Sequence, residues 1–312
     1  NDTVISGCYQ AITYLNDLNC ILIVGGRKSP TRPSASVYML SMHHINSSCY
    51  DTMHGSDDLS PPTTSSAIQR THTFCCKMVP VFINGSRSNR SDIVVTKLTR
   101  WRHAIVAING SQAVISGGIT TGGAVLKDTF LLDCAKEEIR QLPDLPFAIH
   151  SHSLNMVEEN ETNQRSTFLI LIGGLKDSDG YQPNVNVLKY HIQQNVWDVI
   201  SPSLHIPRYN HVSHISQSKL IVIGGVALSD QDLQQYSQGD IEVIDVLSWQ
   251  RHRIIRTTDM SSLMLINFWA FIRNHDAILK RIEICIVGGG GNCFSFGTFF
   301  NPPLSLIEVI YD

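Results

Sequence analysis

Arginine and histidine residues recur in pairs along this 312-residue chain, and their chemistry suits an anionic ligand. In each pair, an arginine or a histidine stands one to three positions before a histidine. The pairs are Arg70 with His72, Arg102 with His103, His150 with His152, and Arg208 with His211. A planar guanidinium group can donate two hydrogen bonds to one phosphate or carboxylate. These pairs, together with Arg27, therefore predict an anion-binding surface.

A glycine-rich segment near the C-terminus is the second feature that suits a ligand. Four consecutive glycines, residues 288–291, are followed by Asn292, Phe294 and Phe296. Glycine lets the backbone approach a ligand closely, and the two rings could stack on a nucleobase. The alternative is that both rings plug the centre of the fold. The segment is not a phosphate-binding loop, because no Gly-Lys-Ser/Thr and no helix pattern follow it.

We expect no catalytic residue, metal site or cofactor site within this chain. The eight cysteines form no CxxC pair and no Cys/His spacing suited to zinc. Cys20, Cys75 and Cys285 lie in apolar strand patterns, which predicts buried, reduced thiols and a cytoplasmic location. The net charge of −3 argues against a strongly basic nucleic-acid binder, although a local basic face remains compatible with it.

An internal repeat supplies the elements that must position these residues. Six stretches begin with an apolar strand, and in five of them this strand ends in two glycines. The diglycines are Gly25-Gly26, Gly117-Gly118, Gly173-Gly174, Gly224-Gly225 and Gly288-Gly289. Residues 81–85 form a degenerate sixth copy, in which Asn84-Gly85 replaces the diglycine. A second alternating strand follows each copy, at residues 37–40, 93–96, 129–132, 186–189, 241–244 and 307–310.

The repeat predicts an all-β, six-bladed kelch-type β-propeller that occupies residues 1–312 as a single domain. Division of the chain into six gives about 52 residues per repeat, which suits a four-stranded blade. The basic/His pairs mark the innermost strand of each blade, and the diglycine ends the second strand. Trp197 and Trp249 suit the outermost strands.

Blade two and the closure of the ring are the irregular parts of this prediction. Blade two is degenerate, and a polar tract at residues 46–71 precedes it. A second polar insertion at residues 155–167 predicts a disordered loop in blade three. We expect residues 3–6 to close the ring by pairing beside residues 307–310, because the last blade otherwise lacks its outermost strand.

Strand parity places the candidate residues on one face. In an up-and-down blade, the loop before the first strand and the loop after the second strand lie on the same side. Arg27, Arg102, His103, Arg208 and His211 therefore gather around one mouth of the central channel. The alternative is that these residues only cap the backbone of the neighbouring blade.

Three segments resemble the C-terminal kelch region of the wybutosine-synthesising tRNA methyltransferases, a leucine carboxyl methyltransferase-like family. They are residues 25–30, residues 100–103 and, most specifically, residues 288–297. The resemblance implies an upstream domain that uses S-adenosyl-L-methionine. It also implies phenylalanine tRNA as substrate, modified at the guanosine 3′ of the anticodon. The weak blade two departs from the kelch pattern between Cys49 and Arg100.

The resemblance leaves the role of the propeller open between contacting the tRNA and supporting the catalytic domain. It implies the upstream methyltransferase domain and tRNA as partners; we expect a monomer with no membrane segment. This chain has no glycine-rich turn between a strand and a helix, so we expect it to bind no S-adenosyl-L-methionine itself. The alternatives are a kelch substrate adaptor and a propeller oxidase or hydrolase.

Overall fold

The structure is a computed structural model. It describes residues 9–29, 32–34, 37–43, 73–77, 98–161, 164–177, 182–200, 204, 206–227, 241–293 and 297–312. All the secondary-structure elements in these residues are β-strands, so the all-β class is confirmed. None of the described residues forms a helix long and apolar enough to cross a membrane.

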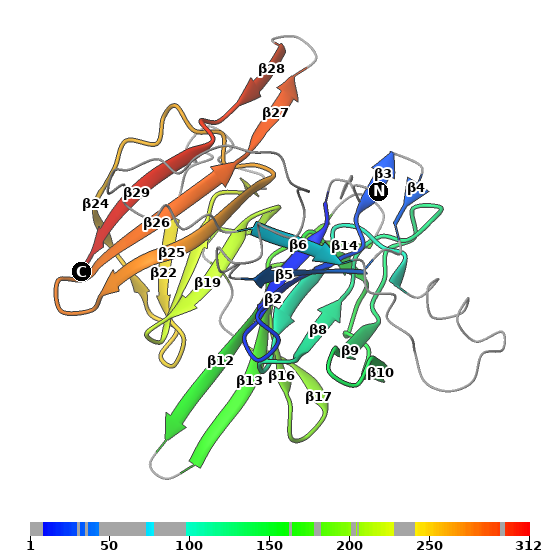
Figure 1. Cartoon of the computed structure of the whole chain (residues 1–312). Helices are drawn as coiled ribbons and strands as arrows, with labels where there is room; N and C mark the ends of the chain where they lie inside the picture. Colours follow the sequence, from blue (N-terminus) through cyan, green and yellow to red (C-terminus); the bar gives the residue numbers. More distant parts are fainter. Residues whose placement is uncertain are drawn as a thin grey trace, which may run out of the picture.

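Five four-stranded antiparallel sheets form the body of the described structure (Figure 1). The first sheet has the order β1 (Ala11–Leu15), β2 (Cys20–Val24), β5 (Val37–His43) and β6 (Thr73–Lys77). The second has β7 (Ala104–Ala107), β8 (Gln112–Ser116), β9 (Thr129–Asp133) and β10 (Glu138–Leu142). The third has β12 (Ser153–Glu161), β13 (Gln164–Ile172), β16 (Val187–His191) and β17 (Val196–Ile200).

The fourth sheet has β19 (Val212–Ser216), β20 (Lys219–Ile223), β22 (Ile241–Asp245) and β23 (Arg251–His252). The fifth has β25 (Phe268–Asp276), β26 (Arg281–Gly288), β29 (Leu304–Tyr311) and β24 (Ile254–Thr257). Shorter strands lie just before an innermost strand or in the segment after a diglycine: β3 (Arg27–Ser29), β4 (Arg32–Pro33), β11 (Ile149–His150), β14 (Leu175–Lys176), β15 (Gln182–Pro183), β18 (Arg208–Tyr209), β21 (Val226–Ala227), β27 (Gly290–Cys293) and β28 (Gly297–Phe300).

The sheets pack face to face in chain order, and their innermost strands β1, β7, β12, β19 and β25 contact one another in that order. An apolar cluster fills each of the four interfaces. β13 shows the cause: Leu169 and Leu171 face the second sheet, whereas Ile170 and Ile172 face the fourth. Alternate side chains of a strand point to opposite faces, and burying each of these contributes about 1.5–3 kcal/mol.

The expected position of the degenerate blade is wrong. The first sheet packs directly on the second, and the backbone N–H of Gly26 donates to the carbonyl of Arg100 at 2.9 Å. β6, which follows the Arg70/His72 pair, is the outermost strand of the first sheet rather than an innermost strand. The strands expected at residues 81–85 and 93–96 lie outside the described residues. The six-blade count and the kelch type stay predictions.

The expected pairing of residues 3–6 beside residues 307–310 is also wrong, because β29, which contains residues 307–310, already has a neighbour on each side. β26 lies on one side of β29, and β24 pairs with the other side through Arg256 opposite Ile310 and Thr257 opposite Val309. Both edges of β29 beside residues 308–311 are therefore taken by local strands. Residues 3–6 lie outside the described residues.

Two smaller expectations are corrected as well. The third-sheet insertion forms a continuous hairpin, in which β12 and β13 pair from Ser153 opposite Ile172 to Glu161 opposite Gln164. Figure 1 shows this hairpin projecting well beyond its sheet. Backbone pairing thus extends through a segment whose composition suggested disorder. Trp197 lies in the outermost strand β17 as expected, but Trp249, with φ 57°, lies in the connection between β22 and β23.

Candidate functional site

Four residues with a repeated turn, which we call the leading segment, lead into the innermost strand of each of the second to fifth sheets; in the fifth sheet the last of them, Phe268, is also the first residue of β25. The leading segments are residues 100–103, 149–152, 208–211 and 265–268. Their third residues all have positive φ: 55° at Arg102, 56° at Ser151, 54° at Asn210 and 53° at Asn267. Tyr9, with φ 59°, stands at the same distance before β1. The repeated turn brings the leading segments to one side of the array, the diglycine face.

A chain of backbone hydrogen bonds joins Tyr9 to the third residues of the first three leading segments. The N–H of Arg102 donates to the carbonyl of Tyr9 at 3.4 Å, that of Ser151 to Arg102 at 2.8 Å, and that of Asn210 to Ser151 at 3.0 Å. The leading segments also pair with the segments after the diglycines, as in β18 with β21. The prediction that both kinds of segment share a face is therefore confirmed for these sheets.

The diglycines fit between two successive leading segments. The second glycine donates its N–H to the first carbonyl of the next segment, at 2.9 Å for Gly118 to Ile149 and for Gly174 to Arg208. The first glycine has no room for a side chain: a Cβ on Gly25 would lie 2.5 Å from the Arg100 oxygen and 2.7 Å from the His103 ring. All ten predicted structural glycines have positive φ. These glycines let successive sheets pack closely, because a side chain there would collide with the next leading segment.

Arg208 is a buried structural residue, which corrects its expected contact with a ligand. It is 3% exposed, and its guanidinium donates to the carbonyl of Gly224 at 2.7 Å and to Glu242 at 2.8 Å. Arg100 repeats this arrangement in the second sheet, where its guanidinium donates to the carbonyl of Gly117 at 2.9 Å and to Asp128 at 2.7 Å. Both arginines tie a leading segment to the diglycine of their own sheet.

The histidines that end the leading segments are also buried. The expectation that His103 and His211 face a ligand is therefore wrong. Each packs against the first glycine of the preceding sheet. Burial, with smaller contributions from nearby positive charges, lowers the pKa of His152 and of His211 to about 3 and that of His103 well below its usual value. These side chains are therefore neutral at pH 7 and act as packing groups.

We expect this burial to make the protein acid-sensitive. The unfolded chain takes up protons on these histidines as the pH falls through about 6.5, whereas the folded chain resists until about pH 3. Their contribution to stability is thus complete above pH 6.5 and is lost progressively below it, by up to about 1.4 kcal/mol per pH unit for each histidine. Urea unfolding at pH 7, 6 and 5 measures the slope.

His152→Phe is the variant that tests this prediction, because Phe268 takes the equivalent position in the fifth sheet. In this variant the free energy of unfolding should fall less steeply between pH 7 and pH 5, by the contribution of one histidine. A slope equal to that of the parent chain would show that His152 does not contribute to it.

Arg27 and Arg102 do meet at the diglycine face, together with two aromatic residues that the sequence-based candidates did not include. The Arg27 guanidinium lies 4.1 Å from the ring centre of Trp101 and 4.9 Å from that of Tyr9. That of Arg102 lies 4.8 Å from both rings. We call these four residues the Arg–aromatic cluster. All four are partly exposed, and the ring centres of Tyr9 and Trp101 are 5.4 Å apart.

The cluster offers stacking surfaces and positive charge at one place. The Nε of Arg102 is buried and has no hydrogen-bond partner among the described residues. Cation–π stacking orders the two guanidinium groups against the rings, so two positive charges and two aromatic faces lie together. Trp101 was present in the sequence beside Arg102, and Tyr9 stands two residues before β1 as Arg102 stands two residues before β7. Alignment of the repeats by the start of each innermost strand was the signal in the sequence that could have identified both aromatic residues.

The glycine-rich segment forms a hairpin of β27 and β28, in which Asn292 pairs with Thr298. Figure 1 shows this hairpin projecting from the end of the fifth sheet. Phe294 and Phe296 lie outside the described residues, so stacking on a base and plugging the channel both stay open.

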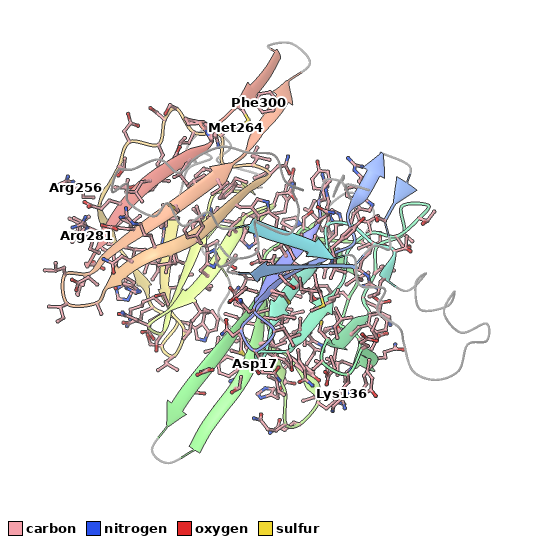
Figure 2. All side chains as sticks on the ribbon, viewed as in Figure 1. Asp17, Lys136, Arg256, Met264, Arg281 and Phe300 are labelled. Atoms are coloured by element: carbon pink, nitrogen blue, oxygen red, sulfur yellow. The ribbon has the colours of Figure 1, made fainter. Side chains whose placement is uncertain are left out.

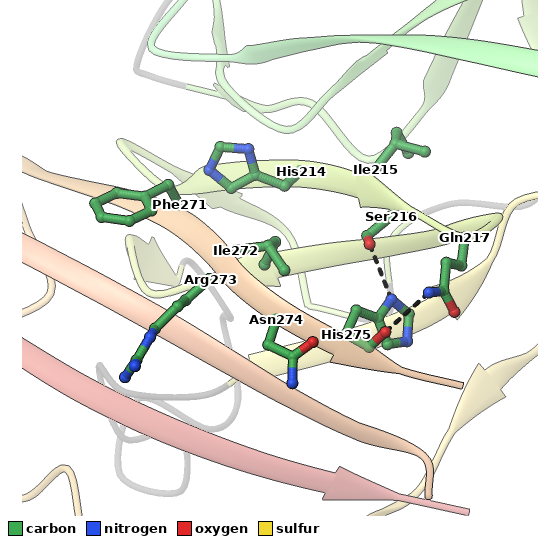
Figure 3. Close-up of a pocket in the computed structure, with 9 residues that line it drawn as sticks. All are labelled: His214, Ile215, Ser216, Gln217, Phe271, Ile272, Arg273, Asn274 and His275. Carbon is green, nitrogen blue, oxygen red and sulfur yellow. Dashed lines mark hydrogen bonds between the residues drawn. The ribbon is translucent and has the colours of Figure 1, made fainter. Parts of the chain in front are cut away.

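A pocket of about 540 Å³ lies between β19 and β25 (Figure 3). His275 there binds Ser216 at 2.9 Å and the Tyr311 hydroxyl at 2.8 Å, and Gln217 donates to the His275 carbonyl at 2.8 Å. These polar groups hold two innermost strands together, so the pocket is part of the sheet interface. Within the described residues, no group of three or more His, Cys, Asp or Glu is placed to hold a metal ion.

Comparison with known proteins decides the family. The family model described as tRNA wybutosine-synthesizing protein 4, beta-propeller, matches residues 86–303, which is more than half of the chain. The chain belongs to this family.

Relatives of this family match almost the whole chain. Human tRNA wybutosine-synthesizing protein 4 is 26% identical over 315 residues, covering 96% of this chain and 38% of the relative. The rat protein is 25% identical over 309 residues, covering 94% and 37%. The yeast protein, from Saccharomyces cerevisiae, is 26% identical over 220 residues, covering 68% and 30%. The chain thus spans less than two fifths of the length of these relatives.

Proposed function

We propose that this chain is the propeller of a wybutosine-synthesising enzyme and that its diglycine face binds phenylalanine tRNA through the Arg–aromatic cluster. Membership of the tRNA wybutosine-synthesizing protein 4 propeller family supports the first part. The arrangement of Arg27, Arg102, Tyr9 and Trp101 supports the second, because proteins bind unpaired nucleotides with aromatic rings and arginine planes.

The cluster suits an RNA loop better than a small anion. Two guanidinium groups stacked on two rings present flat surfaces for bases and positive charge for phosphates in the same small area. The net charge of −3 fits such a local contact, since the chain as a whole is not basic. In this proposal the propeller supplies substrate recognition and no catalytic residue.

The rest of the reaction belongs to other parts of the protein. We propose that S-adenosyl-L-methionine binds to a methyltransferase domain of the same polypeptide and that the protein acts in the cytoplasm as a monomer. The length of the relatives, of which this chain covers 38% at most among those compared, leaves room for such a domain.

Binding of phenylalanine tRNA by the full-length protein tests the proposal. Trp101→Ala should weaken tRNA binding about tenfold or more, because stacking on an aromatic ring contributes about 1–3 kcal/mol per base. Arg102→Lys keeps the charge but loses the planar stacking group, so it should also weaken binding. Filter binding at several salt concentrations gives both the affinity and the number of phosphate contacts.

Arg140→Ala is the matched control, because Arg140 is exposed on the outermost strand β10 of the same sheet. It should leave tRNA affinity unchanged. Thermal unfolding of every variant separates loss of binding from loss of fold. If Trp101→Ala and Arg102→Lys fold and bind tRNA like the parent protein, the diglycine face is not the tRNA site and the propeller serves as a scaffold.

A further inference from the structure

Lys176 lies on the diglycine face, and its ammonium group is held over an aromatic ring. It is the last residue of β14, and its Nζ lies 4.3 Å from the ring centre of Phe147, in the connection that enters the third sheet. Phe147 packs against the apolar cluster between the second and third sheets. The N–H of Asp177 donates to the carbonyl of Ala148 at 3.1 Å and fixes the two segments side by side. A cation within about 6 Å of a ring centre is attracted to the ring, so the Lys176 side chain is ordered on this face.

Backbone pairing places Lys176 close to the Arg–aromatic cluster. The N–H of Ser151 donates to the carbonyl of Arg102 at 2.8 Å. Ile149, two residues before Ser151, lies opposite Lys176 in the pair formed by β11 and β14. Paired strands are about 5 Å apart and strand residues rise about 3.3 Å each, so the backbones of Arg102 and Lys176 lie within about 18 Å of each other. The cluster and Lys176 therefore belong to one surface.

The charge of Lys176 is not neutralised inside the protein. Lys127, in the segment after the diglycine of the second sheet, lies 3.6 Å from the carboxylate of Asp144. Lys176 forms no salt bridge within the described part of the chain, and this includes its exposed neighbour Asp177. Lys176 therefore presents a positive charge that no described carboxylate contacts.

The opposite face of the first three sheets carries negative charge. The turns that join the first strand to the second, and the third to the fourth, lie on that face. Asp17, Glu137 and Glu158 are exposed in or beside these turns, and Lys136 is exposed there as well. Figure 2 shows Asp17 and Lys136 at the end of the sheets that is remote from β3 and β4. An RNA backbone therefore meets more favourable charge on the diglycine face than on the opposite one.

We propose that Lys176, positioned by Phe147, binds a backbone phosphate of the same RNA whose bases stack on the Arg–aromatic cluster. This inference rests on the proposed function and adds a second contact to it. At about 3.4 Å per stacked nucleotide, a separation of about 18 Å corresponds to about five nucleotides, so the two contacts engage different nucleotides of one RNA. Lys176 contributes affinity through charge without reading the sequence, whereas the cluster contacts bases.

Lys176→Ala in the full-length protein tests the proposal, with phenylalanine tRNA as the ligand. Loss of one phosphate contact should weaken binding about three- to tenfold. It should also reduce the slope of log affinity against log salt concentration by about 0.7–0.9. Phe147→Leu keeps the charge and the apolar packing but removes the ring. It should therefore weaken binding less and leave the salt slope unchanged.

Lys189→Ala is the matched control. Lys189 stacks on Phe168 at 3.8 Å in the same sheet, but it lies in the middle of β16 and not on the diglycine face. This variant should bind tRNA with the affinity and salt slope of the parent protein, and its Tm reports the cost of losing a lysine–phenylalanine stack. A folded Lys176→Ala protein with the parental affinity and salt slope would overturn the proposal.

Labelling of lysines with an N-hydroxysuccinimide ester, measured by mass spectrometry, gives an independent test of direct contact. Bound tRNA should protect Lys176 and leave the labelling of Lys189 unchanged. Equal labelling of Lys176 with and without tRNA would contradict the proposal.

These results are separable from the test of the proposed function. If Trp101→Ala weakens tRNA binding and Lys176→Ala does not, the diglycine face still binds tRNA and only the second contact is wrong. If only Lys176→Ala weakens binding and lowers the salt slope, the phosphate contact holds and the Arg–aromatic cluster is not the stacking site. Parental binding by both variants would overturn both proposals.

Discussion

Replacement of Arg208 by alanine is expected to lower the free energy of unfolding by about 3–5 kcal/mol. The change leaves the carboxylate of Glu242, which is fully buried, without the guanidinium 2.8 Å away and with only the half-exposed Arg251 near it, at 3.8 Å. It also removes the hydrogen bond that fixes the carbonyl of Gly224 at 2.7 Å. A buried charge that loses its partner costs more than the original pair contributed. Urea unfolding at pH 7 measures the loss.

The double variant Arg208→Met, Glu242→Leu provides the control for this prediction. It removes both charges and keeps apolar volume, so it should recover much of the stability lost by Arg208→Ala. A fully stable Arg208→Ala protein with reduced tRNA affinity would contradict the structural role and restore Arg208 as a ligand-binding residue.

Replacement of Gly173 by alanine is expected to cost about 3 kcal/mol or more. A Cβ there would meet the carbonyl oxygen of Arg208 and the ring of His211 at distances that real Cβ atoms essentially never show. The backbone of Arg208 is held by the N–H of Gly174 at 2.9 Å, so it cannot move aside without loss of that bond. The third and fourth sheets would have to separate locally.

Gly122→Ala distinguishes this collision from the cost of backbone conformation alone. Gly122 has φ 87°, and a Cβ there would have no described heavy atom within 4 Å. Its replacement should cost only the strain of a left-handed residue, about 1–2 kcal/mol. The difference between the two variants in urea unfolding is the contribution of sheet spacing. Equal losses would mean that the diglycine serves the turn and not the interface.

The sequence by itself determined the class of fold and most strand positions. The diglycines and the apolar–polar alternation repeat at regular distances, and local backbone preference is enough to place strands from such signals. Five of the six expected strand pairs are present in the described sheets, from β2 with β5 to β26 with β29. Parity along the chain also placed the leading segments and the post-diglycine segments on one face, as β18 and β21 show.

The tertiary structure alone decided which basic residues are available to a ligand. Arg208 and Arg102 occupy the first and the third position of equivalent leading segments, and one is paired with Glu242 inside the protein whereas the other stacks on Trp101 at the surface. Burial depends on the side chains of adjacent sheets, which are remote in sequence. The sequence also did not show which strands pair across long separations. β24 lies beside β29 and takes the position expected for residues 3–6.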